Sequence, residues 1–536
     1  GFLNFGMETL VTAICISTLI LLFKRSDFRS LFFRNLYSPS TVAFFLLASV
    51  SFQKTKGWLV YQWDEFTHWA HVVKIMYDYA EFGPSTPTDY TAEGYPPGIS
   101  LFQYFVMDFS SGWIEGMLYW SAHLIILSLI VSVLANCSYK FFIEIILKLC
   151  VALIASLALF TDTYFTITAD PILAFTFGYL ILIAIKTSQQ GGRWIIIFAC
   201  TAGFLTLVKP IAIYFACAAI LINIIATLFT IKFNSLRKLM WSFLPATVAL
   251  VTVGTVWATW GRYISRLNDP NSNNVNISIP TGLQGFADTS FVSEVTSKFI
   301  ESIFGAILNP ASWLAMPASS WTAVCIIFFT IWAYLSGKTN FARNFAIGVT
   351  LLVTTFGYLV VILYSYLTVF GSGEAAALAS FPRYVATWYH GVFFAIVLLI
   401  LSEVDFGAYV TSNQFDAKSS GLINRQKHIG VLLVAFIYLN TISSLGYYVF
   451  MLRSSPNLGI DWREPLFKTT NAIKAAKIPD GSKVYIVTQH RAGFEFYLLR
   501  YEMVGAQFGE MPFSIGTKKD EGDIWTEEAM DAKKWS

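Results

Sequence analysis

Charged residues are scarce in this sequence. Only 13% of its 536 residues are Asp, Glu, Lys or Arg, whereas a soluble domain carries roughly 25%. Hydrophobic residues make up 55% and aromatic residues 17%, and the mean hydropathy is +0.58. This composition excludes a soluble enzyme, a disordered chain and a disulfide-rich secreted module. A membrane protein with many spans remains.

Cysteine is also rare, with six residues. Each lies in or at the end of an apolar run, so we expect small buried side chains, no disulfide and no cysteine-bound metal. The sequence has no GxGxxG, no Walker motif, no Ser-His-Asp pattern and no basic patch suited to nucleic acid. We therefore expect neither a nucleotide bound by a glycine-rich loop nor a nucleic-acid partner.

Long apolar runs are what the sequence does have. Twelve of them approach the length of a membrane-spanning helix, at 8–23, 40–53, 117–137, 143–161, 171–186, 194–208, 210–231, 239–260, 320–336, 344–369, 389–403 and 429–452. The predicted fold class is an all-α polytopic membrane protein of about 12 transmembrane helices, occupying residues 1–452. The run at 40–53 is the weakest of the twelve.

The basic residues predict an orientation. Sixteen Lys and Arg residues lie in one alternating set of short loops, and eight are spread over the longer loops of the other set. The positive-inside rule places the first set in the cytoplasm. Both ends of the chain then lie outside, together with long loops at 54–116, 261–319 and 371–389.

The last 84 residues, 453–536, form the predicted extracytoplasmic C-terminal segment. A helix ending at Ala476, a strand over Lys483–Thr488 and a helix over Phe494–Arg500 indicate a small α/β unit. Large outer loops facing short basic ones favour an enzyme that works at the outer membrane surface. A transporter more often has short loops on both faces.

The first outer loop carries the most informative pattern. Asp64 and Glu65 directly follow an apolar stretch, and an amphipathic helix is expected through Phe82. Tyr95-Pro96-Pro97-Gly98 then opens a second helix over Ile99–Phe109. The alternative interpretation is that Asp64 only caps the helix, with Glu65 in its first turn.

This order of features resembles the GT-C superfamily of integral membrane glycosyltransferases, nearest to its protein O-mannosyltransferase and aminoarabinose transferase branch. The resemblance implies a polyprenyl-phosphate-linked sugar donor and an active site on the outer face. It implies a catalytic role for Asp64, with Glu65 as the adjacent candidate. Chemistry agrees, because a carboxylate can take the proton of an acceptor hydroxyl.

Further polar residues interrupt the apolar pattern on the same face. Asp162 and Asp170 lie in the turn before the fifth run, and the resemblance implies that one of them positions the acceptor or a metal. His68 follows Asp64 at helical spacing and is a weaker candidate for that task. The alternatives are that Asp170 and Pro171 cap the next helix and that His68 packs at the interface.

Two cationic positions are candidates for the donor phosphate. Lys209, before Pro210, is costly at membrane depth unless it is solvated or paired. Arg383 has a fork-shaped guanidinium that can grip a phosphate, and Tyr384 follows it. A snorkelling Lys209 and an Arg383–Glu374 ion pair are the structural alternatives.

We therefore expect an inverting glycosyltransferase that passes a sugar from a polyprenyl-phosphate donor to a hydroxyl of a cell-envelope glycan, lipid or protein. No cofactor is required, and a divalent cation, Mg²⁺ or Mn²⁺, stays an open alternative. The expected location is the bacterial inner membrane, with the site on the periplasmic side. The alternatives are a flippase or transporter for a lipid-linked saccharide, a ligase or polymerase using a diphosphate-linked donor, and a non-catalytic scaffold.

Overall fold

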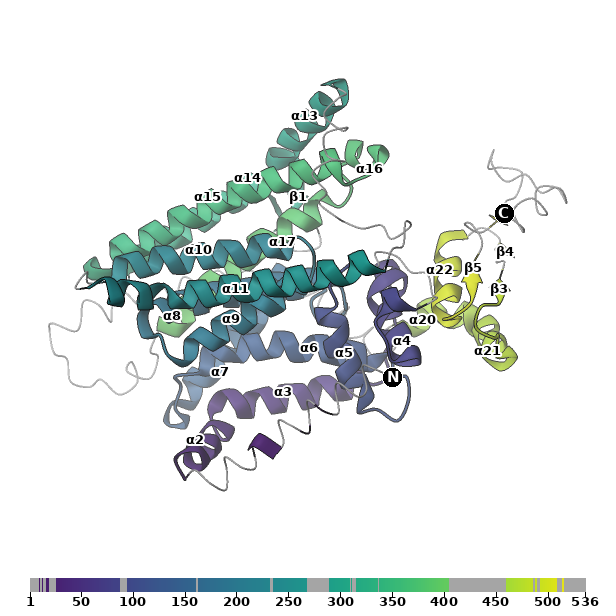
Figure 1. Cartoon of the computed structure of the whole chain (residues 1–536), viewed down its shortest axis with the longest axis horizontal. Helices are drawn as coiled ribbons and strands as arrows, with labels where there is room; N and C mark the ends of the chain where they lie inside the picture. The colour runs from purple at the N-terminus through teal and green to yellow at the C-terminus, as the bar shows by residue number, and fades with distance from the viewer. Residues whose placement is uncertain are drawn as a thin grey trace.

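The computed structural model describes much of the chain, in several stretches. These are residues 9, 12, 16–18, 26–86, 94–160, 162–231, 235–267, 289–308, 310, 315–335, 337–403, 459–484, 487–488, 492–508 and 513–514. Most of these residues form α-helices that run side by side as a bundle (Figure 1). The all-α class of the bundle is confirmed. Cys15, most of the apolar run at 8–23, the whole run at 429–452 and the end of the chain lie outside the described residues.

The bundle consists of helices that follow one another along the chain. They are α2 (Ser26–Leu36), α3 (Pro39–Thr55), α6 (Gly116–Ile130) with η3 (Val131–Leu134), η4 (Tyr139–Phe141) with α7 (Phe142–Leu159), α8 (Ala169–Gln190), α9 (Arg193–Thr206), α10 (Ala212–Thr230), α11 (Leu236–Arg266), α14 (Ala318–Leu335), α15 (Lys338–Thr368) and α17 (Phe381–Glu403).

Seven helical stretches are long and apolar enough to cross a bilayer. They are Gly116–Leu134, Tyr139–Leu159, Ala169–Gln190, Ala212–Thr230, Leu239–Arg266, Asn340–Thr368 and Phe381–Ser402. The runs predicted at 40–53, 194–208 and 320–336 do form helices, but α3, α9 and α14 are shorter or more polar than these seven. The described residues therefore support a membrane protein and do not establish twelve spans.

Helices α8 and α17 form the centre of the bundle, and nearly every residue of both is buried. Two glycines let them approach closely. A Cβ atom on Gly178 would lie 2.6 Å from the Gly391 carbonyl oxygen, and one on Gly391 would lie 2.8 Å from the Ala174 carbonyl oxygen. Only glycine fits at this crossing without pushing the two backbones apart.

Shorter elements gather at one end of the bundle. The first long loop forms a π-helical turn, η1 (Glu65–Trp69), followed by α4 (Ala70–Tyr79), η2 (Gly83–Ser85) and α5 (Gly98–Asp108). Both predicted helices of this loop are confirmed. The later loops form α13 (Thr289–Gly305), then a hairpin of β1 (Ile307–Leu308) and β2 (Met316–Pro317), and α16 (Ser372–Ala376).

The C-terminal segment lies against this same end (Figure 1). It contains α20 (Ile460–Arg463), η6 (Glu464–Leu466), α21 (Phe467–Ala476) and α22 (Ala492–Glu502). Its strands are β3 (Lys483–Val484), β4 (Val487–Thr488), β5 (Gln507–Phe508) and β6 (Phe513–Ser514). Strands β3 and β5 pair in parallel, as do β4 and β6. A small α/β unit is thus present, although its strands are only two residues long.

Candidate functional site

Four of the predicted site residues form one continuous chain of ion pairs. Arg383 Nη1 lies 2.5 Å from Asp64 Oδ2, and Arg383 Nε lies 3.5 Å from Asp170 Oδ2. Lys209 Nζ lies 2.7 Å from the other oxygen of Asp170, Oδ1. Asp64 directly precedes η1, and Lys209 lies between α9 and α10. Arg383 and Asp170 lie in the first turns of α17 and α8. Four segments that are distant in the sequence therefore meet at one point.

The packing of the helices explains why these residues meet. Asp170 lies eight residues before Gly178, and Arg383 lies eight residues before Gly391. Because the two glycines mark the close crossing of α8 and α17, the same offset brings the starts of both helices level. A second close approach places Lys209, since the Gly98 N–H donates to the Leu207 carbonyl at 2.8 Å. A Cβ on Gly98 would lie only 2.7 Å from Leu207 Cβ.

The ion-pair chain is exposed to solvent at one end and buried at the other. The side chains of Asp64 and Arg383 are each 41% exposed, whereas those of Asp170 and Lys209 are 6% and 8% exposed. Among the described residues, Asp64 has no hydrogen-bond donor other than Arg383. A ligand can therefore reach Asp64 and Arg383 from solvent, while Asp170, itself paired with Lys209, binds Arg383 from the buried side.

Two tyrosines line the cationic part of the site. The Tyr384 ring centroid lies 5.2 Å from Lys209 Nζ and 5.5 Å from Arg383 Cζ, within the range of cation–π attraction. Burial alone lowers the pKa of Lys209, but Asp170, Tyr95 and Tyr384 together outweigh burial and hold that pKa above its ordinary value. Tyr95 lies near the same cations, and burial raises its pKa. The sequence analysis treated Tyr95 only as part of the Tyr95-Pro96-Pro97-Gly98 helix start and did not predict it as a site residue.

Asp162 lies close enough to interact electrostatically with this chain. Burial raises the pKa of Asp162, the Asp170 carboxylate raises it further, and Arg383 opposes the change. Among the described residues Asp162 forms no ion pair within 4.0 Å. The structure thus places Asp170 in the chain and Asp162 beside it, where the sequence favoured the two equally.

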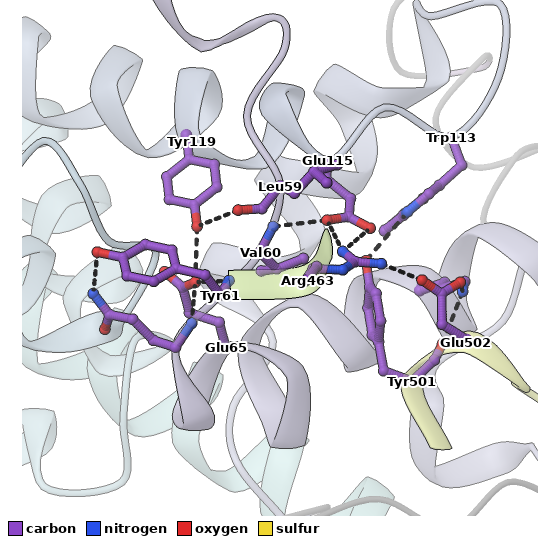
Figure 2. Close-up of polar contacts among 12 residues, drawn as sticks. Leu59, Val60, Tyr61, Glu65, Trp113, Glu115, Tyr119, Arg463, Tyr501 and Glu502 are labelled. Atoms are coloured by element: carbon purple, nitrogen blue, oxygen red, sulfur yellow. Dashed lines mark hydrogen bonds and ion pairs between the residues drawn. The ribbon is translucent and has the colours of Figure 1, made fainter. Parts of the chain in front are cut away.

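The Glu65 side chain is fully buried, and its carboxylate points toward the backbone of Tyr61 and the hydroxyl of Tyr119 (Figure 2). Its Oε2 accepts hydrogen bonds from the N–H groups of Tyr61 and Gln62 and from the Tyr119 hydroxyl, at 2.7 to 3.1 Å. Its Oε1 accepts from the Ile167 N–H at 3.1 Å. Burial raises the pKa of Glu65 to about 7, although these four donors oppose the shift. Glu65 thus fastens the Asp64 segment to the turn that leads to Asp170.

The contacts of Asp64, Asp170, Lys209 and Arg383 differ from the purely structural roles that the sequence left open for them. Asp64 is the N-cap residue of η1, yet its side chain makes no capping hydrogen bond. The carboxylate of Asp170 serves the two cations, and the N-cap of α8 is Thr168. Lys209 is buried and paired, so it does not snorkel. Arg383 pairs with Asp64 and Asp170, and no ion pair joins it to Glu374 in the part of the chain that the structure describes.

His68 is packed among aromatic rings. Its ring centroid lies 4.6 Å from that of Trp69 and 5.1 Å from that of Tyr95, both edge-on. No group of three or more His, Cys, Asp or Glu suited to a metal ion occurs among the described residues. The acids of the site instead contact cations of the protein. The described cysteines form no disulfide.

A second buried cluster joins the first long loop to the C-terminal segment (Figure 2). Arg463 Nη1 donates to both oxygens of Glu115, at 2.9 and 2.7 Å, and Arg463 Nη2 donates to Glu502. Glu115 Oε2 also accepts from the Val60 N–H at 2.7 Å. Burial alone raises the pKa of Glu502, but the cations of Lys74, Arg463 and Lys474 hold it below its ordinary value.

Aromatic contacts extend this junction to the site itself. The Tyr497 ring lies 5.0 Å from the Trp63 ring, and the Phe494 ring lies 5.0 Å from the Phe66 ring. The π-helical turn that follows Asp64 is therefore held by α22. The sequence interpretation missed this cluster, although a glutamate directly before an apolar run at Gly116 was a usable signal.

The chain matches no model of a known protein family, no curated protein and no solved structure.

Proposed function

We propose that this chain is a membrane glycosyltransferase of the GT-C type, which transfers a sugar from a polyprenyl-phosphate donor to an acceptor hydroxyl. The observation that carries the proposal is the chain Asp64–Arg383–Asp170–Lys209. It combines a solvent-reachable carboxylate, a solvent-reachable guanidinium and a buried pair behind them. A base and an anion-binding group side by side are what transfer from a sugar phosphate needs.

The reaction is a single displacement. The acceptor oxygen attacks the anomeric carbon of the sugar, and its proton passes to the Asp64 carboxylate. The bond between the anomeric carbon and the phosphate oxygen breaks, and its electron pair leaves with the polyprenyl phosphate. One displacement inverts the configuration at that carbon. Arg383, backed by Lys209 and Tyr384, stabilises the charge that grows on the departing phosphate.

The ion pair between Asp64 and Arg383 suggests how the base is activated. A carboxylate bound to a guanidinium is a weak base because the cation stabilises its ionised form. A donor phosphate that takes over the open donors of Arg383 would release Asp64 for the acceptor. Asp170 is then a positioning residue that orients both cations, Glu65 holds the segment, and Asp162 is left to contact the acceptor. No cofactor is needed, and a divalent cation stays optional.

The side of the membrane on which the site lies is also part of the proposal. The distribution of basic residues in the sequence favours an Asp64 end that lies outside the cytoplasm, and we propose the periplasmic face of a bacterial inner membrane. A lipid-linked donor cannot leave the bilayer, so the site has to lie at its surface. The acceptor would be a cell-envelope glycan, lipid or protein.

The test is transfer by the purified full-length chain from a panel of radiolabelled polyprenyl-monophosphate sugars, in its host's membrane lipids. Asp64→Asn should abolish transfer, and Asp108→Asn, an exposed acid at the end of α5, should leave it unchanged. Full activity in a folded Asp64→Asn protein would disprove the assignment of the base. Transfer only from diphosphate-linked donors would favour the ligase, and movement of intact lipid-linked saccharide without transfer would favour the flippase.

A further inference from the structure

An apolar groove of about 260 Å³ lies on the side of the bundle formed by α3, α6 and α7. Both α3 and α7 pack against α6. The groove wall on α3 consists of Leu47, Val50, Ser51 and Lys54, which follow helical spacing and therefore share one face. Val50 is 62% exposed, and its neighbour Leu46 is 64% exposed. Exposed apolar side chains in a chain of this composition face lipid, so the groove opens toward the bilayer.

One end of the groove is closed by aromatic side chains. Trp58 stacks on Phe165 with ring centroids 5.6 Å apart and an interplanar angle of 20°. Tyr164 completes this end. The polar groups inside the groove satisfy each other. His123 Nε2 lies 3.0 Å from the Tyr164 carbonyl, which can only accept, so Nε2 carries the proton. His123 Nδ1 then accepts from the Ser51 hydroxyl at 2.7 Å.

Lys54 supplies the charge of the groove. It lies at the end of α3, beside the aromatic closure. No lining residue is acidic, and Lys54 forms no ion pair with any residue that the structure describes. The groove thus combines a long apolar wall with a single positive charge at one end. A neutral apolar ligand would make no ion pair with the Lys54 ammonium, and a small soluble anion would not cover the apolar wall.

We propose that this groove binds an anionic phospholipid, with one acyl chain along α3, α6 and α7 and the phosphate on the ammonium of Lys54. The site is separate from the Asp64 cluster but joined to it by hydrogen bonds. The Tyr61 hydroxyl donates to the Phe165 carbonyl at 3.2 Å, and the Thr166 hydroxyl donates to Gln62 Oε1 at 3.2 Å. A lipid that fills the groove therefore braces the segments on which Asp64 and Asp170 lie.

The experiment measures binding of dioleoyl phosphatidylglycerol to the purified full-length chain in detergent, by native mass spectrometry and by the unfolding midpoint. Dioleoyl phosphatidylcholine tests the charge at equal chain length, and inorganic phosphate tests the headgroup without a chain. Lys54→Gln should lower the affinity for phosphatidylglycerol about fivefold, since one lysine near an anionic lipid surface contributes on that order. Lys54→Arg should retain binding, and Leu153→Trp, which fills the groove, should abolish it.

Lys56→Gln is the matched control, because Lys56 is exposed two residues away and does not line the groove. Its affinity should equal that of the unchanged protein. Equal affinities of Lys54→Gln and Lys56→Gln would overturn the proposal. Equal binding of phosphatidylcholine and phosphatidylglycerol, or saturation by inorganic phosphate alone, would overturn it too. None of these outcomes depends on the proposed transferase activity.

Discussion

Gly178 on α8 and Gly391 on α17 lie at the close crossing of the two helices, and each follows a member of the Asp170–Arg383 ion pair by eight residues. This crossing sets both the distance between the two helices and their relative register. The geometry of the candidate site therefore depends on two residues that carry no functional group.

Gly178→Ala should destabilise the protein by about 1 to 3 kcal/mol, the usual cost of overpacking. The added Cβ would lie 2.6 Å from the Gly391 carbonyl oxygen, and backbone cannot move aside as a side chain can. The measurement is the unfolding midpoint in detergent. Gly254→Ala on α11 is the control, since a Cβ there has no atom within 4 Å. This control should be neutral or slightly stabilising because alanine favours helix. A Gly178→Ala protein as stable as the control would contradict the close crossing.

Lys209→Met should lower the free energy of unfolding by about 3 kcal/mol, because it removes one cation from the buried carboxylate of Asp170. The double variant Lys209→Met with Asp170→Asn should regain part of that loss, since the uncompensated charge is gone. A double-mutant cycle on unfolding midpoints measures the coupling. Strictly additive losses would show that the two side chains do not interact.

Glu65→Gln should destabilise the protein. Both carboxylate oxygens of Glu65 accept hydrogen bonds from backbone N–H groups, and in glutamine an NH₂ group replaces one of these oxygens. The NH₂ group cannot accept, so one buried N–H loses its partner. The loss should also depend on pH. The pKa of Glu65 is raised from its ordinary 4.5 to about 7 in the folded chain. The favourable contribution of neutral Glu65 is therefore fully present below about pH 4.5 and is lost as the pH rises to about 7.

The stability advantage of the unchanged protein over Glu65→Gln should accordingly shrink by about 3 kcal/mol between these two pH values and stay constant above them. Paired unfolding curves at a series of pH values measure it, and other titrating groups cancel in the difference. An advantage that grows with pH would mean that the hydrogen bonds to Glu65 outweigh its burial.

Arg463→Gln should loosen the C-terminal segment, because it leaves Glu115 buried without its cation and removes one cation from Glu502. A loss of about 3 kcal/mol is typical of a broken buried ion pair. Trypsin should then release C-terminal fragments faster than from the unchanged protein, as followed by a C-terminal tag. Lys468→Gln, an exposed position on α21, is the control and should leave the cleavage rate unchanged.

The sequence by itself determined the class of the protein and the short-range structure. The apolar runs specify helices, since a chain in lipid must satisfy its backbone hydrogen bonds within one segment. Pro97 and the amphipathic pattern located α5 and α4 through local effects. The same reasoning identified Asp64, Asp170, Lys209 and Arg383, because a charge beside an apolar run stands out from its surroundings.

Only the tertiary structure decided which of these charges meet. Asp64 and Arg383 are 319 residues apart, and their contact depends on how α8, α17 and η1 pack together, which no local pattern specifies. The same holds for Glu65 and Asp64, which are neighbours in sequence with opposite surroundings. The π-helical turn η1 buries one carboxylate among four donors and leaves the other at the surface. The Glu115–Arg463–Glu502 cluster likewise exists only because the C-terminal segment folds back onto the first loop, where burial turns ordinary surface charges into a linked core.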